Sequence, residues 1–153
     1  MNELVEKIKA ALTTFNFFNS VEIKGFGLIG IDGFNEFSGS IPTATIGICA
    51  IDNIQQTPDG MLECGLNLSI VFSATVNYAE QPIFQDLKIL ENILLMLNNG
   101  YWDGVNLKLT ATKPYSVKAT NYYEPNLYNK EMSIWRIDWV QKIKLGQDKF
   151  LYQ

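Results

Sequence analysis

A chain of 153 residues, of which 47% are hydrophobic and 18% charged, can bury a core of its own, which excludes a disordered protein. The formal net charge is −4, and the nearest approach to a basic cluster is the pair Lys142 and Lys144, which argues against sequence-specific nucleic-acid binding. Met1 to Phe15 lacks the continuous apolar core of a signal peptide, and the longest strongly apolar run, Ile93 to Leu97, is too short to cross a bilayer. We expect one soluble domain, residues 1–153, made in the cytoplasm.

The first predicted elements are a helix and a short strand. Asn2 can cap the helix, and Glu3 suits its positive end. Its apolar stripe consists of Leu4, Ile8, Ala11, Leu12 and Phe15. Residues 21–24 alternate as a strand, and the glycines of residues 25–40 then predict a hairpin or extended arm. The aromatic residues that this arm would expose are Phe26, Phe34 and Phe37.

A long antiparallel hairpin is predicted next. Residues 41–51 form its first strand, residues 53–60 form a polar loop that ends in a Thr-Pro-Asp-Gly turn, and residues 61–77 form its second strand. The alternation in the second strand is typical of a sheet covered on one side only. Its apolar face consists of Leu66, Leu68, Ile70, Phe72, Ala74 and Val76, and its polar face of Asn67, Ser69, Ser73 and Thr75.

A second helix starts near Pro82 and ends at Asn98-Asn99-Gly100. Its predicted buried stripe is Ile83, Leu87, Leu90, Leu94 and Leu97. Residues 105–111 alternate as a third strand, and residues 113–130 are polar and rich in tyrosine, as in a broken strand and loop.

The last predicted strand covers residues 132–145. One face carries Trp135, Ile137, Trp139, Ile143 and Leu145, and the other carries Arg136, Asp138, Lys142 and Lys144. The tryptophans of this strand could form a stacking platform for a sugar or a base, but aromatic pairs at strand spacing favour a core position. The predicted fold class is α+β: a mainly antiparallel sheet of about four strands with two helices packed on one face, plus the glycine-rich hairpin arm.

One motif suggests a dinucleotide site. Gly25 to Gly30 spells G-x-G-x-x-G, and Asp52 follows about 20 residues later, where a ribose-binding acid would lie. Such a site needs a helix that starts inside the motif, because the pyrophosphate binds the N-terminus of that helix. Residues 31–42 contain two glycines and a proline and show no helical stripe. The pattern therefore favours a flexible hairpin over a nucleotide site.

Catalytic and metal centres are not indicated either. The chain has no histidine, which excludes Ser-His and Cys-His nucleophile pairs. Asp32 and Glu36 fall in the arm, and Asp138 shares a strand face with Arg136, which predicts a surface ion pair. We expect no catalytic residues, no metal and no cofactor.

The two cysteines lack the spacing of a metal site. Cys49 and Cys64 lie on the two strands of the predicted hairpin, close in space but slightly out of register. Both are expected to be free, slowly reacting thiols in apolar surroundings.

The order of elements then becomes informative. A first helix, a central hairpin and a leucine-rich helix precede a closing strand with the sequence Ile134-Trp135-Arg136-Ile137-Asp138-Trp139-Val140-Gln141. This arrangement resembles the tail-terminator (tail-completion) proteins, in particular the Mu-like terminators of contractile-tailed phages and prophages. The element order, though not the residues, is also similar to the terminators of lambda-like siphophages. The resemblance covers nearly the whole chain, and its residue-level part is the closing strand.

The resemblance implies a structural virion protein: a homohexameric ring that caps the head-proximal end of the tail. The implied partners are the chain itself, the tail tube, the sheath and the head-completion or connector protein. The protein would be made in the bacterial cytoplasm and would reside in the virion tail. Candidate contacts with these partners are Phe26, Phe34, Phe37, Tyr122, Tyr123 and Tyr128.

Two alternatives stay open. One is a different component of a virion or injection machine, such as a baseplate or head-tail connector protein. The other is a small-ligand-binding domain or an enzyme that uses a cleft between the sheet and the arm.

Overall fold

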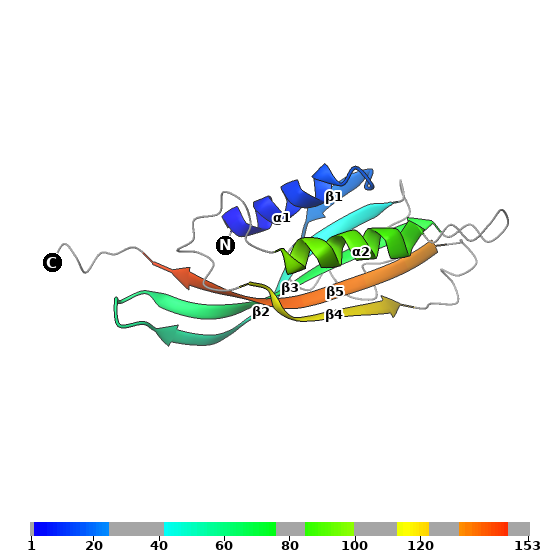
Figure 1. Cartoon of the computed structure of the whole chain (residues 1–153). Helices are drawn as coiled ribbons and strands as arrows, with labels where there is room; N and C mark the ends of the chain where they lie inside the picture. The colour runs from blue at the N-terminus through cyan, green and yellow to red at the C-terminus, as the bar shows by residue number, and fades with distance from the viewer. Residues whose placement is uncertain (1, 25–41, 76–84, 100–112, 123–131, 147–153) are drawn as a thin grey trace.

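The computed structural model describes residues 2–24, 42–75, 85–99, 113–122 and 132–146 (Figure 1). Several predictions lie outside these residues, among them the glycine-rich arm over residues 25–40 and the strand over residues 105–111. The elements are α1 (Asn2–Thr14), β1 (Ser20–Ile23), β2 (Thr43–Gln56), β3 (Leu62–Thr75), α2 (Gln85–Asn98), β4 (Tyr115–Tyr122) and β5 (Met132–Leu145).

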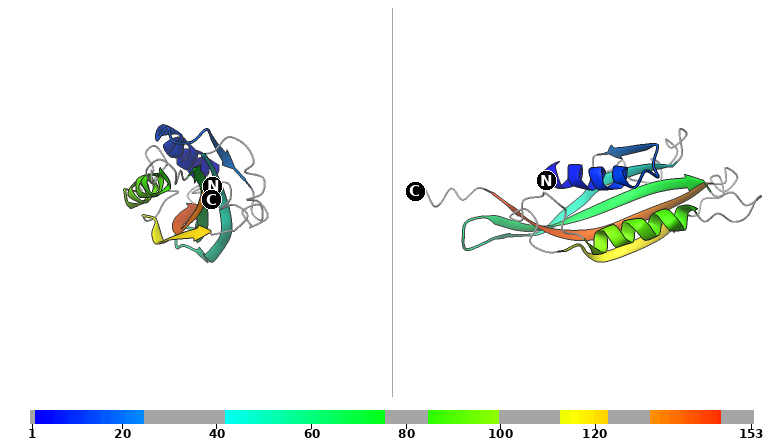
Figure 2. Two further views of the ribbon diagram at one scale, coloured as in Figure 1. Left: turned by 90° about the vertical axis from the view of Figure 1, so that its right-hand side faces the viewer. Right: turned by 45° about the horizontal axis from the view of Figure 1, so that its top comes forward.

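The strands form one five-stranded sheet in the order β1-β2-β3-β5-β4. β1 runs parallel to β2, and the other three pairs are antiparallel. Both helices lie on the same face of this sheet, α1 over β1 and β2, and α2 over β3 and β5 (Figures 1 and 2). The predicted α+β fold is confirmed, with five described strands instead of about four.

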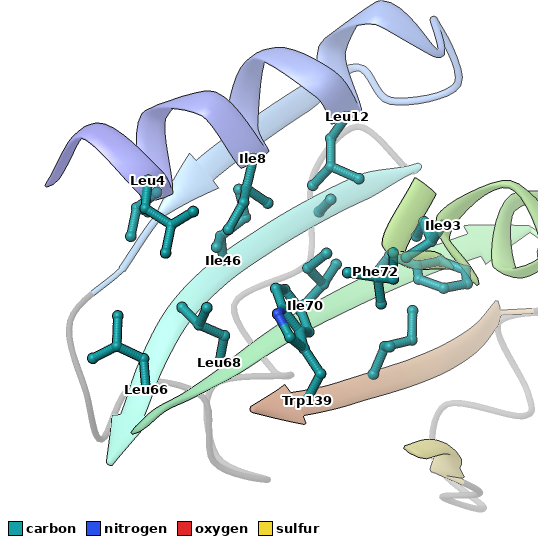
Figure 3. Close-up of a cluster of buried hydrophobic side chains, with 14 of the residues drawn as sticks. Leu4, Ile8, Leu12, Ile46, Leu66, Leu68, Ile70, Phe72, Ile93 and Trp139 are labelled. Atoms are coloured by element: carbon teal, nitrogen blue, oxygen red, sulfur yellow. The ribbon is translucent and has the colours of Figure 1, made fainter. Parts of the chain in front are cut away.

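The core lies between the two helices and one face of the sheet, which we call the inner face (Figure 3). Ile70 on β3 pairs with Ile46 on β2 and with Ile137 on β5, so three isoleucines meet side by side. Trp139 pairs with Leu68 and is almost fully buried. From α1, the buried side chains are Leu4, Val5, Ile8 and Leu12.

The hairpin was predicted correctly, but its loop is shorter than expected. β2 continues to Gln56, and the turn closes with a hydrogen bond of 2.8 Å from the Thr57 N–H to the Met61 carbonyl. The polar residues after Asn53 therefore belong to a strand, because solvent-exposed strand positions accept polar side chains. In the turn, the Thr57 hydroxyl and then the Met61 N–H donate to the Asp59 carboxylate and lower its pKa.

The predicted stripe of α2 is correct for Leu97, which is buried, but wrong for most of the helix. The buried positions are Asp86, Ile89, Ile93 and Leu97, whereas Leu87 is 45% exposed. Leu90 and Leu94 are only partly buried. The reason is that apolar residues occupy most of the helix circumference, so their periodicity does not determine which side faces the sheet.

The prediction that only one face of the sheet is covered is also wrong for the centre of the sheet. On the opposite face, which we call the outer face, the almost fully buried residues are Ser69, Val71, Ser73 and Ile134. Part of the cover comes from neighbouring side chains of the same face, since Arg136 reaches over to Ser69 and Thr43 lies 3.0 Å from the Ser73 hydroxyl. Small polar residues tolerate this burial because they have hydrogen-bond partners.

Replacing Trp139 with Ala should lower the free energy of unfolding by about 3–5 kcal/mol, because it leaves a large cavity between β5, β3 and the helices. Urea unfolding followed by circular dichroism measures this loss. The matched control is Leu95→Ala, which removes an exposed side chain from α2 and should change stability by less than about 0.5 kcal/mol. Equal midpoints for the two variants would show that Trp139 is not a core residue.

Candidate assembly surface

The most exposed part of the described sheet is the far half of β2. All residues from Ala50 to Gln56 are exposed, in contrast to the buried residues at the start of the strand. We call this segment the β2 tip. It reaches beyond both helices and, with the start of β3, forms a projecting hairpin (Figures 1 and 2). β1 pairs with β2 only from Thr43 to Ile46, so no described strand covers the outer edge of the β2 tip.

The β2 tip presents isoleucines to solvent. Ile54 is 63% exposed and Ile51 is 41% exposed, which is unusual for β-branched side chains on a regular hairpin. The pairing with β3 shifts register between Asp52 and Gln55, and Asn53 there has a φ of 53°. This bulge bends the strand at the point where Ile54 faces outward. The tip is anchored in part by the Asn67 amide, which donates to the Asp52 carboxylate.

The opposite margin of the sheet is β4, which pairs with β5 alone among the described strands. Its residues from Tyr115 to Lys118 are exposed, and Val117 is 42% exposed. The pairing with β5 shifts register between Tyr115 and Lys118, and Ser116 has a φ of 53°. The sequence indicated a broken strand and loop here, and the bulge is where the strand is interrupted.

A polar network joins three strands on the outer face. The Arg136 guanidinium donates to Asp138 Oδ1 at 2.8 Å and to Ser69 Oγ at 3.2 Å, and the Ser69 hydroxyl donates to Asp138. The Cys49 thiol lies 3.0 Å from the same hydroxyl. The ion pair predicted between Arg136 and Asp138 is therefore present. The network as a whole links β2, β3 and β5 to one another.

A second network fastens α2 to the sheet. Asp86 Oδ2 accepts hydrogen bonds from the Ser133 hydroxyl at 3.0 Å and from Trp135 Nε1 at 3.1 Å. Asn121 on β4 donates to the same Ser133 hydroxyl at 3.3 Å. Asp86 is almost fully buried, and its Oδ1 has no hydrogen-bond partner among the described residues. An acid in the first turn of a helix is usually explained by the helix dipole, so this anchor could not be predicted from the sequence.

Of the residues expected to contact partners, most lie outside the described ranges: Phe26, Phe34, Phe37, Tyr123 and Tyr128. Tyr122 is the last residue of β4, and its backbone pairs with Ile134. In the closing strand, Ile137 and Trp139 are buried in the core and Trp135 packs against it. The bond from Trp135 to Asp86 occupies the polar edge of this indole, so the two tryptophans do not form an open stacking platform.

The described residues contain neither a metal-binding cluster nor a membrane-spanning helix. No group of three Cys, Asp or Glu side chains there is arranged to hold a metal ion. No helix of the described ranges is long and apolar enough to cross a membrane. The G-x-G-x-x-G motif at residues 25–30 lies outside these ranges, and Asp52 is an exposed residue of the β2 tip.

The expected proximity of the cysteines is wrong. Cys49 lies level with Leu68 and Asn67 on the outer face, whereas Cys64 pairs with Ile143 on the inner face. Three to four residues along a strand separate these levels by roughly 10–13 Å, beyond the Cα spacing of a disulfide. The turn at residues 57–61 sets the register of β2 with β3, and this register places Cys49 opposite residues 67 and 68. Both thiols are free, and burial raises the pKa of Cys64.

Comparisons with known proteins give a weak structural likeness. No family model and no curated protein matches the chain. Among solved structures, it is similar to the sheath/tube terminator, in the extended state, of an extracellular contractile injection system named PVC. The TM-score is 0.34 at 14% identity, and the match covers 96% of this chain and 57% of the other. This chain thus spans little more than half the length of that terminator, and a likeness of this size carries no argument about function.

Replacing Asp86 with Ala should lower the free energy of unfolding by about 1–3 kcal/mol, because the partly buried Trp135 and Ser133 donors lose their acceptor. Asp86→Asn keeps an acceptor oxygen and should lower the free energy of unfolding by less. Chemical unfolding measures both, with Glu91→Ala on the exposed side of α2 as the control. An Asp86→Ala variant as stable as the control would contradict the role of this anchor.

The two thiols should react at different rates. Cys49 is partly exposed, whereas Cys64 is buried with a raised pKa and holds less of the reactive thiolate at neutral pH. Mass spectrometry after brief maleimide treatment of the folded protein should find Cys49 labelled first. Labelling of Cys64 should speed up as the pH rises. Equal rates, or a mass two hydrogens low before labelling, would refute this assignment.

Proposed function

We propose that this chain is a structural tail protein whose copies form a ring at the head-proximal end of a phage-like tail and end the polymerisation of its tube. The observation that carries the proposal is the β2 tip, which has exposed residues on both faces, an edge that no described strand covers, and exposed isoleucines. An open edge with apolar side chains promotes association between chains, so its presence favours a protein that works in an assembly.

The resemblance to tail terminators supports the same conclusion. The closing strand from Ile134 to Gln141 uses both of its faces, with Trp139 in the core and Asp138 in the outer-face network. The order of a first helix, a hairpin, a second helix and a closing strand agrees with the expected element order. We propose a Mu-like terminator with a hexameric ring, without enzymatic activity or cofactors.

The proposed partners follow from this role. They are other copies of the chain, the tail tube, the sheath where the tail is contractile, and a head-completion or connector protein. The net charge of −4 suits a ring through which DNA passes, because an acidic surface does not hold phosphates. The proposed location is the virion tail.

The test combines the oligomeric mass of the purified chain with the length of the tail tube. Light scattering after size exclusion of the purified chain, alone and with tube ends added, should give the mass of a closed oligomer, and negative-stain images should show rings. Removal of the gene from the phage or prophage should give tubes of uncontrolled length, and the wild-type chain should restore the normal length.

Two results would contradict the proposal. A chain that stays monomeric even with tube ends present would exclude the ring. A ring whose removal leaves tube length unchanged would instead indicate a baseplate or connector component.

A further inference from the structure

The sheet has two different open margins. The strand order β1-β2-β3-β5-β4 puts the β2 tip on one side and β4 on the other. In the described part of the chain, neither the outer edge of the tip nor that of β4 pairs with another strand. Two unlike margins on opposite sides of a molecule allow copies to associate head to tail, as a ring requires.

The two margins share one local geometry. In each, a register shift contains a polar residue with a φ of 53°, Asn53 in β2 and Ser116 in β4. The next residue in each case is an exposed β-branched one, Ile54 and Val117. Bulges of this kind interrupt the backbone ladder and hinder the open-ended addition of strands. What each margin offers to a partner is therefore an apolar side chain beside a bend.

The charges of the margins are opposite. From Thr43 to Leu62 the charged residues are Asp52 and Asp59, both negative. From Lys113 to Tyr122 they are Lys113 and Lys118, both positive. Unlike margins attract each other, whereas pairing of two β2 tips or two β4 edges brings like charges together at a cost. The charge pattern thus favours contact between different margins.

We propose that the β2 tip of one copy binds the β4 edge of the next copy of this chain. Ile54 and Val117 form the apolar centre of this contact, and Asp52 faces the lysines of β4. Repetition of the same contact around an axis closes the ring. The inference rests on the proposed function, because it names the surfaces through which that ring would form.

Cross-linking between marked copies tests this contact. Cys49 and Cys64 are first replaced by Ser, and Ile54→Cys and Val117→Cys are made in separate chains. A short bis-maleimide should link the two chains when they are mixed and should leave each one uncoupled alone. Leu95→Cys, exposed on α2, replaces Val117→Cys in the matched control and should give no link to position 54.

A photo-reactive amino acid at position 54 of the otherwise unchanged chain gives the same test without removing cysteines. Its products should map to residues 113–122. A ring by light scattering whose cross-links lie elsewhere, or in which position 54 links to itself, overturns this contact and leaves the proposed function standing. A chain that remains monomeric even with tube ends overturns both.

Discussion

β3 and β5 pair along fourteen consecutive positions without a register shift, from Leu62↔Leu145 to Thr75↔Met132. This register puts Trp139 beside Leu68 on the inner face and Asp138 beside Ser69 on the outer face. A slip by one residue would move each of these side chains to the opposite face. Both helices, both polar networks and the β2 tip depend on this pairing.

The two networks keep the rest of the molecule in place around these central strands. Asp86 holds the start of α2 against β5, and through Ser133 it is linked to Asn121 of β4. Arg136 and Asp138 join β5 to β3, with Cys49 of β2 beside them. The β2 tip then continues past this region, and among the described strands it pairs with β3 alone. An exposed tip that extends from a hydrogen-bonded base suits a segment that meets a partner.

The sequence predicted the elements whose pattern has one interpretation. Alternation in β3 and β5 identified both strands and their inner faces, and the Thr-Pro-Asp-Gly turn located the hairpin. Prediction from the sequence failed where one pattern is compatible with more than one structure. α2 is apolar on most sides, so only tertiary packing decides that Ile89 and Ile93 are buried while Leu87 is exposed. The polar end of β2 resembles a loop because both of its faces meet solvent, and the role of Asp86 depends on residues almost fifty positions away.

The central claim is that the β2 tip is an assembly surface, and a cryo-EM reconstruction of the chain on tail ends tests it most directly. The account predicts a closed ring in which Ile51 and Ile54 of every copy are covered by a neighbouring copy. A closed ring in which residues 50–56 of every copy remain open to solvent would contradict it.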